Sequence, residues 1–484
     1  MIVLFHPRST RPKNRRLPLS VLHLAAVLEG REEYAIVDGN VDPDPWATID
    51  SLLQTHHVEL LGVSVMPGPQ LRGAIAVCRA VREEYPHVPI VWGGYFASLY
   101  TEACLNSKYV DFVVKGQGEE TLLELIAALR GGRNYAAVRG LSFKDAFGLH
   151  VHTGERPLKP PDDFPWPPYH RLDLSKYIAR TFLGSRTAVH QASIGCPFKC
   201  NFCGVVPVYD REKMESPART AAILASLQGR YGINAVQFYD NNFFLREEHA
   251  RELADRIAPF GLRWWCEARV DIVLGYSDDT LRRLRAAGCV MIFFGVESGS
   301  DAKLRAMKKQ LTAEQAVGLA RRLRDFDIVP EYSLIFGNPE DAEHDVAENI
   351  AFARRIKGAN PAVEIVVQTY VPTPQRHGAY GGVEVPFPRT PDEWASDQWY
   401  PLLIRTDPQL PWLPRHVKRR IRDFETVMNA RWPTTQDVRL SAWGRALLQT
   451  LGSWRYALGA YDHPAELRLA QKLVRLREPR LESL

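Results

Sequence analysis

Short apolar and β-branched runs alternate with helical patterns over the first 130 residues. Between the third and fourth runs, apolar side chains recur at helical spacing, at Leu71, Ile75, Cys78 and Tyr85. This alternation predicts a doubly wound, Rossmann-like α/β domain, in which helices cover both faces of a parallel sheet. Its strands are predicted at residues 2–5, 34–39, 60–65, 88–92 and 109–114.

A second series of strands and helices follows residues 155–170, which are too rich in proline for a helix or a sheet interior. A helical pattern covers residues 216–232. Six βα units predict a partial (β/α)6 TIM-like barrel. Its strands are predicted at residues 187–195, 235–242, 262–271, 290–300, 329–339 and 362–374.

The tail carries helical runs at 414–428 and 466–476, which predict a small, mainly helical C-terminal region. A chain of 484 residues exceeds what one hydrophobic core usually serves. We therefore predict an N-terminal domain, a proline-rich linker, the partial barrel and the helical region, over residues 1–140, 141–185, 186–375 and 376–484.

Composition and charge narrow the functional classes. The net charge of +5 is spread over 61 basic and 56 acidic residues, so no nucleic-acid partner is predicted. No run of about eighteen apolar residues occurs, and charge appears too early for a signal peptide, so we predict no integral membrane segment and a cytoplasmic location. Seven cysteines without regular spacing fit reduced thiols better than a disulfide framework.

Candidate ligand-binding loops lie at the predicted carboxyl ends of the strands, where parallel sheets bind their ligands. In the first domain these loops are residues 6–10, 66–70, 93–96 and 116–119. Their glycines and prolines permit a close approach of backbone to a large ligand, or merely end strands. In the barrel, polar residues collect after the strands, at Asp240, Asn241, Glu267, Arg269, Glu297 and Ser298.

The stretch SIGCPFKCNFCG places Cys196, Cys200 and Cys203 within eight residues. Thiolates are the usual ligands of iron–sulfur clusters, and three of them leave one iron of a four-iron cluster open to a small molecule with amino and carboxylate groups. The alternatives are a zinc site, for which only His190 is near as a fourth ligand, and a redox thiol set.

This Cys-x3-Cys-x2-Cys spacing resembles the signature of the radical S-adenosylmethionine (SAM) superfamily. The resemblance extends through residues 295–299 and 335–339 and covers roughly residues 187–375. It implies a 4Fe–4S cluster on the three cysteines and SAM at its open iron. Asp-Asn-Asn stands at 240–242 where other members have Gly-Gly-Glu or Asp-Asp.

The resemblance also implies roles for individual residues. Phe202 would contact adenine, and Arg269 would bind the methionine carboxylate. Asp240 and Asn241 would receive the methionine amino group. The remaining implied SAM contacts are Glu267, Gly337, and, for the ribose hydroxyls or the amino group, Glu297 and Ser298.

The loops of the first domain resemble those of the cobalamin-binding domain that precedes the barrel in one large subfamily. The Asp-x-His-x-x-Gly motif is absent, and Phe96 follows Tyr95 where a histidine could stand, so the implied cobalamin has no histidine below cobalt. Met66 and Pro67 would face that side. The alternative is a doubly wound fold that binds a nucleotide or nothing. The implied cobalamin contacts are Ser64, Met66, Pro67, Gly68, Gln70, Gly93, Gly94, Tyr95, Gly116, Gln117, Gly118 and Glu119.

Together these resemblances imply a cobalamin-dependent radical SAM enzyme of the methyltransferase type. A 5′-deoxyadenosyl radical would take a hydrogen atom from an unactivated carbon of a small-molecule or lipid-like substrate, and methylcobalamin would supply the methyl group. An external donor of the flavodoxin or ferredoxin type would supply electrons. The alternatives are cyclisation or rearrangement with the same cofactors, and a non-catalytic iron–sulfur or cobalamin-binding protein.

The C-terminal tail leaves two questions open. Its basic stretch, residues 415–422, is either a solvated helix face or a contact for an anionic surface. Six tryptophans either line an apolar pocket or build a core, at positions Trp394, Trp399, Trp412, Trp432, Trp443 and Trp454.

Overall fold

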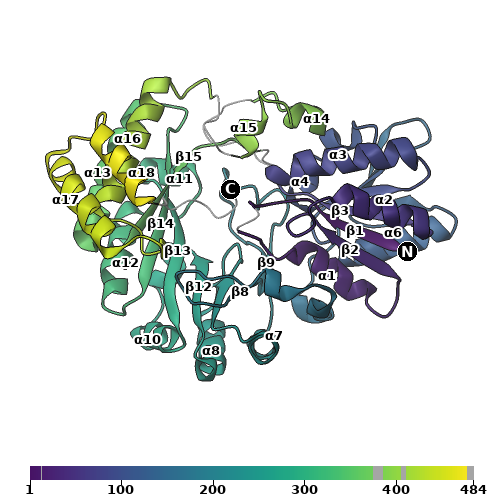
Figure 1. Cartoon of the computed structure of the whole chain (residues 1–484), viewed down its shortest axis with the longest axis horizontal. Helices are drawn as coiled ribbons and strands as arrows, with labels where there is room; N and C mark the ends of the chain where they lie inside the picture. Colours follow the sequence, from purple (N-terminus) through teal and green to yellow (C-terminus); the bar gives the residue numbers. More distant parts are fainter. Residues whose placement is uncertain (12–13, 374–384, 405–409, 477–484) are drawn as a thin grey trace.

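A computed structural model of the chain describes residues 1–11, 14–373, 385–404 and 410–476. Its N-terminal half is a seven-stranded sheet in the order β2-β1-β3-β4-β5-β6-β7, drawn in purple and blue in Figure 1. The strands are β1 (Ile2–His6), β2 (Tyr34–Asp38), β3 (Leu60–Ser64), β4 (Ile90–Gly93), β5 (Phe112–Val114), β6 (Leu141–Lys144) and β7 (His150–His152). The helices are α1 (Leu19–Leu28), α2 (Pro45–Thr55), α3 (Pro69–Glu84), α4 (Gly94–Leu99), α5 (Thr101–Leu105) and α6 (Glu119–Arg130).

The first five strands of this sheet are parallel, as predicted. Every residue of β1 and β3 is buried, which explains why these strands are continuous apolar runs rather than alternating ones. The order 2-1-3-4-5 is that of a doubly wound sheet whose ligand crevice lies at the switch point between β1 and β3.

The linker prediction was wrong for residues 141–152. Strand β6 pairs antiparallel with β5, and β7 pairs antiparallel with β6, so the sheet continues past the predicted boundary at residue 140. These strands have four and three residues, too few to show a hydrophobic period. The rest of the predicted linker contains three short 3-10 turns, at Pro161–Asp163, Tyr169–Arg171 and Leu174–Lys176, and an isolated β-bridge from Ala179 to Thr187.

The second half is a six-stranded parallel sheet in the order β15-β14-β13-β12-β11-β8, the predicted partial barrel. Its strands are β8 (Thr187–His190), β11 (Ala235–Phe238), β12 (Arg263–Ala268), β13 (Cys289–Glu297), β14 (Val329–Phe336) and β15 (Glu364–Thr369). Its helices are α7 (Pro217–Tyr231), α8 (Glu247–Ile257), α9 (Val270–Leu274), α10 (Asp278–Ala286), α11 (Asp301–Ala306), α12 (Ala313–Arg324) and α13 (Ala342–Ala359).

The first predicted barrel strand, residues 187–195, is divided in two. After β8 the chain turns, and β9 (Ser193–Gly195) pairs antiparallel with β10 (Glu212–Met214). The loop with the three cysteines runs between β9 and β10. The two ends of that loop are therefore fixed to each other by a hairpin.

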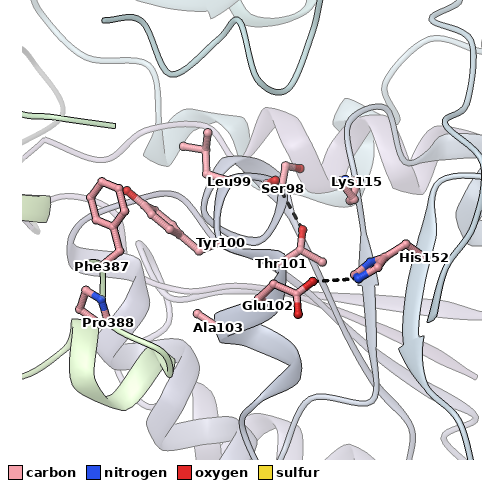
Figure 2. Close-up of a pocket in the computed structure, with 10 residues that line it drawn as sticks. All are labelled: Ser98, Leu99, Tyr100, Thr101, Glu102, Ala103, Lys115, His152, Phe387 and Pro388. Atoms are coloured by element: carbon pink, nitrogen blue, oxygen red, sulfur yellow. Dashed lines mark hydrogen bonds and ion pairs between the residues drawn. The ribbon is translucent and has the colours of Figure 1, made fainter. Parts of the chain in front are cut away.

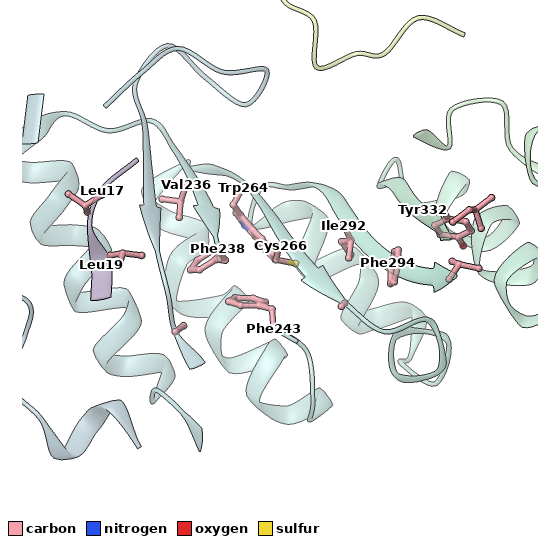
Figure 3. Packing of buried hydrophobic residues seen from close by; sticks show 14 of the residues in the cluster. Leu17, Leu19, Val236, Phe238, Phe243, Trp264, Cys266, Ile292, Phe294 and Tyr332 are labelled. Carbon is pink, nitrogen blue, oxygen red and sulfur yellow. The ribbon is translucent and has the colours of Figure 1, made fainter. Parts of the chain in front are cut away.

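One hydrophobic cluster runs through both halves of the molecule. Leu17 and Leu19 of the N-terminal half belong to the same cluster as Phe238 and Trp264 of the barrel (Figure 3). Phe238 and Trp264 meet edge to face with ring centroids 5.8 Å apart. This shared core holds the ligand-binding edges of the two sheets in a fixed relation.

The C-terminal region touches both halves. Its helices are α14 (Pro391–Trp394), α15 (Tyr400–Leu403), α16 (Arg415–Arg431), α17 (Ala442–Leu458) and α18 (Ala465–Val474). Helices α16–α18 pack together beside α13, whereas α14 packs on α3 of the N-terminal half (Figure 1). Arg72 of α3 donates to the Ala395 carbonyl at 2.8 and 3.0 Å and pairs with Asp397 at 3.0 Å.

The tryptophans of the tail have different environments. Trp394 is fully buried, 4.4 Å from Tyr100 between ring centroids, whereas Trp443 and Trp454 are 71% and 50% exposed. The six tryptophans therefore do not line a single pocket. In the basic stretch, Val417 and Ile421 are buried while the arginines at 415, 419, 420 and 422 face solvent. None of the helices that the structure describes has the length and apolar composition to cross a bilayer.

Candidate functional site

The cysteine loop begins directly after β9. Gly195 has φ +83°, and a Cβ there would collide with the Arg211 carbonyl on the returning side of the hairpin. Farther along, the Cys203 amide donates to the Cys200 carbonyl at 3.2 Å, which closes a turn around the second and third cysteines. All three cysteines are free thiols.

The thiols lie close enough to influence one another. Burial, with the charges of Cys203 and Cys200 in addition, raises the pKa of Cys196 to about 11. Within the described residues, no three His, Cys, Asp or Glu side chains are grouped to ligate a single ion. A cubane cluster would take each of the three sulfurs on a different iron.

His190, the only candidate for a fourth zinc ligand, is engaged elsewhere. Its Nε2 lies 2.8 Å from Glu215 Oε2, and both side chains are 2% exposed. Burial opposes the charge of Glu215, but His190, Thr220 and Arg219 outweigh it and lower its pKa to about 2. His190 therefore serves a buried ion pair behind the loop.

Arg269 reaches the cysteine loop from the end of β12. Its Nη1 donates to Cys200 Sγ at 3.6 Å, and its guanidinium carbon lies 3.7 Å from the centre of the Phe198 ring. Its Nε and Nη2 each donate to Asp271 at 3.0 Å, and Nη2 also donates to the Lys309 carbonyl at 2.5 Å. Of the five N–H donors of an arginine, one on Nη1 is left for a ligand. Binding of the methionine carboxylate by Arg269 stays a prediction.

Glu297 ends β13 with φ +72° and forms a buried ion pair that the sequence analysis did not predict. Lys309 Nζ lies 2.8 Å from Glu297 Oε1, and each residue is 6% exposed. Gly295 makes room for this pair, because a Cβ there would lie 2.8 Å from Lys309 Nζ. Ser298, fully buried, accepts the Ser300 amide at 3.2 Å and so serves the turn after the strand.

Phe202, the predicted adenine contact, packs in a small apolar cluster. Its neighbours there are Met307, Ile335, Tyr370 and Trp412. The C-terminal region also contacts Gly337, another predicted SAM contact, because Trp412 Nε1 donates to the Gly337 carbonyl at 3.1 Å. The C-terminal region therefore contributes to the wall beside the cysteine loop, which no local pattern indicated.

A second carboxyl group lies near Asp240 at the end of β11. Burial raises the pKa of Asp240 to about 7. Burial, with the charge of Asp240 in addition, raises the pKa of Glu212 on β10 to about 8. Among the residues that the structure describes, neither carboxyl oxygen of Glu212 has a hydrogen-bond partner. Two neighbouring buried carboxyl groups favour a cation, and an amino group is one that fits the implied ligand. Glu212 carries no sequence signal and was not predicted.

The loop after β3 belongs to a buried network at the switch point. The Met66 amide donates to Gln70 Oε1 at 2.7 Å, and Gln70 Nε2 lies 2.9 Å from His6 Nε2. His6 Nδ1 lies 3.1 Å from Asp38, which also accepts the Tyr177 hydroxyl at 2.5 Å. Gln70 is 1% exposed, whereas the Met66 side chain is 45% exposed. The network thus fixes the loop and leaves Met66 open to a ligand.

The other predicted cobalamin residues serve the loops in different ways. Gly94 has φ +88°, and a Cβ there would lie 2.8 Å from the Val65 carbonyl, so two ligand loops approach closely at this glycine. The Ser64 hydroxyl donates to Ser20 at 2.8 Å. Gln117 Oε1 accepts the Lys159 amide at 2.9 Å. The side chains of Ser64 and Gln117 are therefore engaged within the protein.

Residues 116–119 close this edge of the sheet. The Gly116 amide donates to Ser98 Oγ at 3.1 Å. A Cβ on Gly118 would lie 3.2 Å from the side chain of Leu24. Glu119 is 7% exposed, and burial raises its pKa. Glycine at 116 and 118 thus lets this loop pack closely.

The two predicted sites meet at Tyr95. Its hydroxyl donates to Asn241 Oδ1 at 3.4 Å, and its ring lies edge to face with that of Tyr209 at 5.9 Å. Burial raises the pKa of Tyr95, and the charges of Cys203 and Cys196 raise it further. A neutral tyrosine of the predicted cobalamin loops therefore touches both the loop after β11 and the segment that follows the cysteines.

A pocket of about 450 Å³ lies beside these loops, next to Gly116, and holds none of the predicted site residues. Glu102 pairs there with His150 at 2.6 Å and with His152 at 2.8 Å. Figure 2 shows its lining side chains, which are Ser98, Leu99, Tyr100, Thr101, Glu102, Ala103, Lys115, His152, Phe387 and Pro388.

Comparison with known families identifies a domain in each half of the chain. Residues 11–126 match the B12 binding domain, and residues 191–353 match the radical SAM superfamily. The chain is therefore a radical SAM protein with an N-terminal B12-binding domain, and the predicted fold class and family are confirmed. The predicted cofactors, which are a 4Fe–4S cluster, SAM and cobalamin, are those of these two domains.

Individual relatives agree with this assignment. An uncharacterized methyltransferase of Pyrococcus horikoshii is 27% identical over 70% of this chain and 73% of its own length. An anaerobic magnesium-protoporphyrin IX monomethyl ester cyclase of Cereibacter sphaeroides is 24% identical over 69% of this chain, which spans 56% of that protein. The radical SAM methyltransferase TsrM of Kitasatospora setae, solved with cobalamin and a 4Fe–4S cluster, shares the fold with a TM-score of 0.67, 18% identity and 98% coverage of both chains.

Proposed function

We propose that the protein is a cobalamin-dependent radical SAM methyltransferase that methylates an unactivated carbon of a small-molecule or lipid-like substrate. The observation that carries the proposal is the contact between Tyr95 and Asn241 at 3.4 Å, because it joins the predicted cobalamin loops to the predicted SAM loops. A methyl group and a substrate radical must meet within one cavity, so loops that touch suit methyl transfer. Relatives named as methyltransferases support the same conclusion.

The residues present suit the three cofactors. Cys196, Cys200 and Cys203 would hold the cluster, while Asp240 and Asn241 would receive the methionine amino group. When bound, the cluster supplies an electron, SAM the radical-forming group and cobalamin the methyl group. The Met66 side chain, open at the switch point, would face the corrin side where no histidine ligand stands.

The protein's own contribution is orientation and exclusion of water. Arg269 and the Lys309–Glu297 pair fix the wall around Cys200, and all three side chains are nearly inaccessible to solvent. Tyr95 stays neutral and presents a hydroxyl between the two sets of loops. An external protein of the flavodoxin or ferredoxin type would deliver the electron.

The test uses anaerobically purified full-length protein reconstituted with iron, sulfide and cobalamin. With SAM and a strong reductant we expect release of 5′-deoxyadenosine, and with substrate we expect S-adenosylhomocysteine in step with methylated product. A Cys203→Ala variant should release no deoxyadenosine. Deoxyadenosine without S-adenosylhomocysteine would indicate cyclisation or rearrangement, as the cyclase relative suggests, and would refute methyl transfer. Absence of both products from cluster-loaded protein would indicate a binding protein.

A further inference from the structure

Arg269 is bound to the protein on nearly every side. It is 5% exposed, its face covers the Phe198 ring, and one of its edges is held by Asp271. The opposite terminal nitrogen, Nη1, points to Cys200 Sγ at 3.6 Å. A guanidinium held by a ring and a bidentate carboxylate has a fixed direction, so this N–H is aimed at the sulfur.

We propose that Arg269 tunes the reduction potential of the cluster by donating this hydrogen bond to the Cys200 sulfur. The inference rests on the proposed function, because it requires a cluster on the three cysteines. One electron from the external reductant adds negative charge to the cluster and its sulfur ligands, and no bond is made or broken. A donor aimed at a ligand sulfur stabilises the reduced form more than the oxidised form, which raises the potential.

Because the surrounding charges cancel, the direction of the Arg269 N–H bond decides the effect on the reduction potential. Asp271 balances Arg269 at 3.0 Å, and Glu297 balances Lys309 at 2.8 Å, so the two cations and two anions sum to zero. Among these four groups, Arg269 donates a hydrogen bond to a cysteine sulfur, at 3.6 Å. Burial lowers the local dielectric and strengthens this single contact.

The test is a potential titration of the reconstituted protein without SAM, monitored by electron paramagnetic resonance. Arg269→Gln removes the donor and the charge, and Arg269→Lys keeps the charge without the planar fork. Arg322→Gln is the matched control, because Arg322 also ties a turn, donating to the Leu274 and Tyr276 carbonyls at the opposite end of α9.

In Arg269→Gln we expect at least a tenfold fall in the ratio of reduced to oxidised cluster at a fixed potential, which is about 59 mV for a one-electron couple. The ratio for Arg269→Lys should lie between those of Arg269→Gln and wild type, and the ratio for Arg322→Gln should match that of wild type. An unchanged potential in Arg269→Gln together with weakened SAM binding would overturn the proposal and assign Arg269 to the methionine carboxylate.

A second measurement needs no variant. The iron–sulfur(Cys) stretching bands of the wild-type cluster should shift after exchange into D2O, because the donor proton is replaced by a deuteron. Bands that do not move would overturn the proposal even if the variants fail to assemble a cluster. Failure of the proposed function has a different result, namely wild-type protein that assembles no 4Fe–4S cluster under the same conditions.

Discussion

Replacing Lys309 by methionine tests the buried ion pair beside the cysteine loop. The substitution removes the ammonium group that lies 2.8 Å from Glu297 Oε1 and keeps a side chain of similar length. Glu297 is 6% exposed, so its carboxylate would stay out of water without a counter-ion. Breaking a buried pair in this way costs about 3–5 kcal/mol, because an uncompensated charge is left behind.

Two further variants separate the free energy of the ion pair from the free energy lost through poorer packing. Glu297→Gln alone leaves a buried ammonium group without its partner and should also destabilise. The double variant Glu297→Gln with Lys309→Met removes both charges and should recover at least half of the loss of Lys309→Met. The coupling free energy from this cycle measures the pair itself.

The assay is urea unfolding followed by tryptophan fluorescence, with Trp264 and Trp265 on β12 as reporters of the barrel. With a slope of roughly 2 kcal/mol per molar urea, a loss of about 3–5 kcal/mol moves the midpoint down by more than 1 M. A Lys309→Met midpoint within about 0.3 M of wild type, roughly 0.6 kcal/mol on that slope, or a double variant no more stable than the single one, would refute the reasoning.

Three further predictions concern the loop, the contact between sites and acid stability. Gly195→Ala should destabilise by more than about 1 kcal/mol and lower the iron content after reconstitution, because φ is +83° and the hairpin backbone leaves no room for a Cβ; a fully loaded variant contradicts this. Tyr95→Phe should still bind both cofactors, but without the bond to Asn241 it should form less methylated product per deoxyadenosine, as chromatography would measure. Glu215 has its pKa lowered to about 2 by His190 and its other partners, so its stabilisation is present above pH 4.5 and lost between about pH 4.5 and 2; Glu215→Gln should flatten the stability profile in that window, and an unchanged profile counts against the pair.

The sequence predicts the parts of this molecule that depend on local pattern. The apolar and β-branched runs predicted the six parallel strands of the barrel and the five parallel strands of the N-terminal sheet. The clearest of these runs are strands that are buried almost throughout, such as β1, β3, β11 and β14. The cysteine spacing pointed to the cluster because three thiols on one loop have few other uses. Both signals lie within short stretches of chain.

The features that the sequence does not predict depend on contacts between residues that are far apart in the chain. Strands β6 and β7 are too short to show a hydrophobic period, and residues 191–192 separate β8 from β9 within what the sequence predicts as one strand. The partners of Arg269 come from Cys200 and the Lys309 carbonyl, 69 and 40 residues away in the sequence. Lys309 and Glu212 look like surface residues in the sequence, and only the fold shows that they are enclosed.

The anchoring of the tail on both halves has a consequence for biogenesis. A ribosome makes the N-terminal sheet and the barrel before the C-terminal region, because translation runs from the N-terminus at roughly 5–20 residues per second. Trp412 and α14 dock only then. The wall beside the cysteine loop, to which Trp412 contributes, is therefore completed only after the three cysteines and both sheets have left the ribosome.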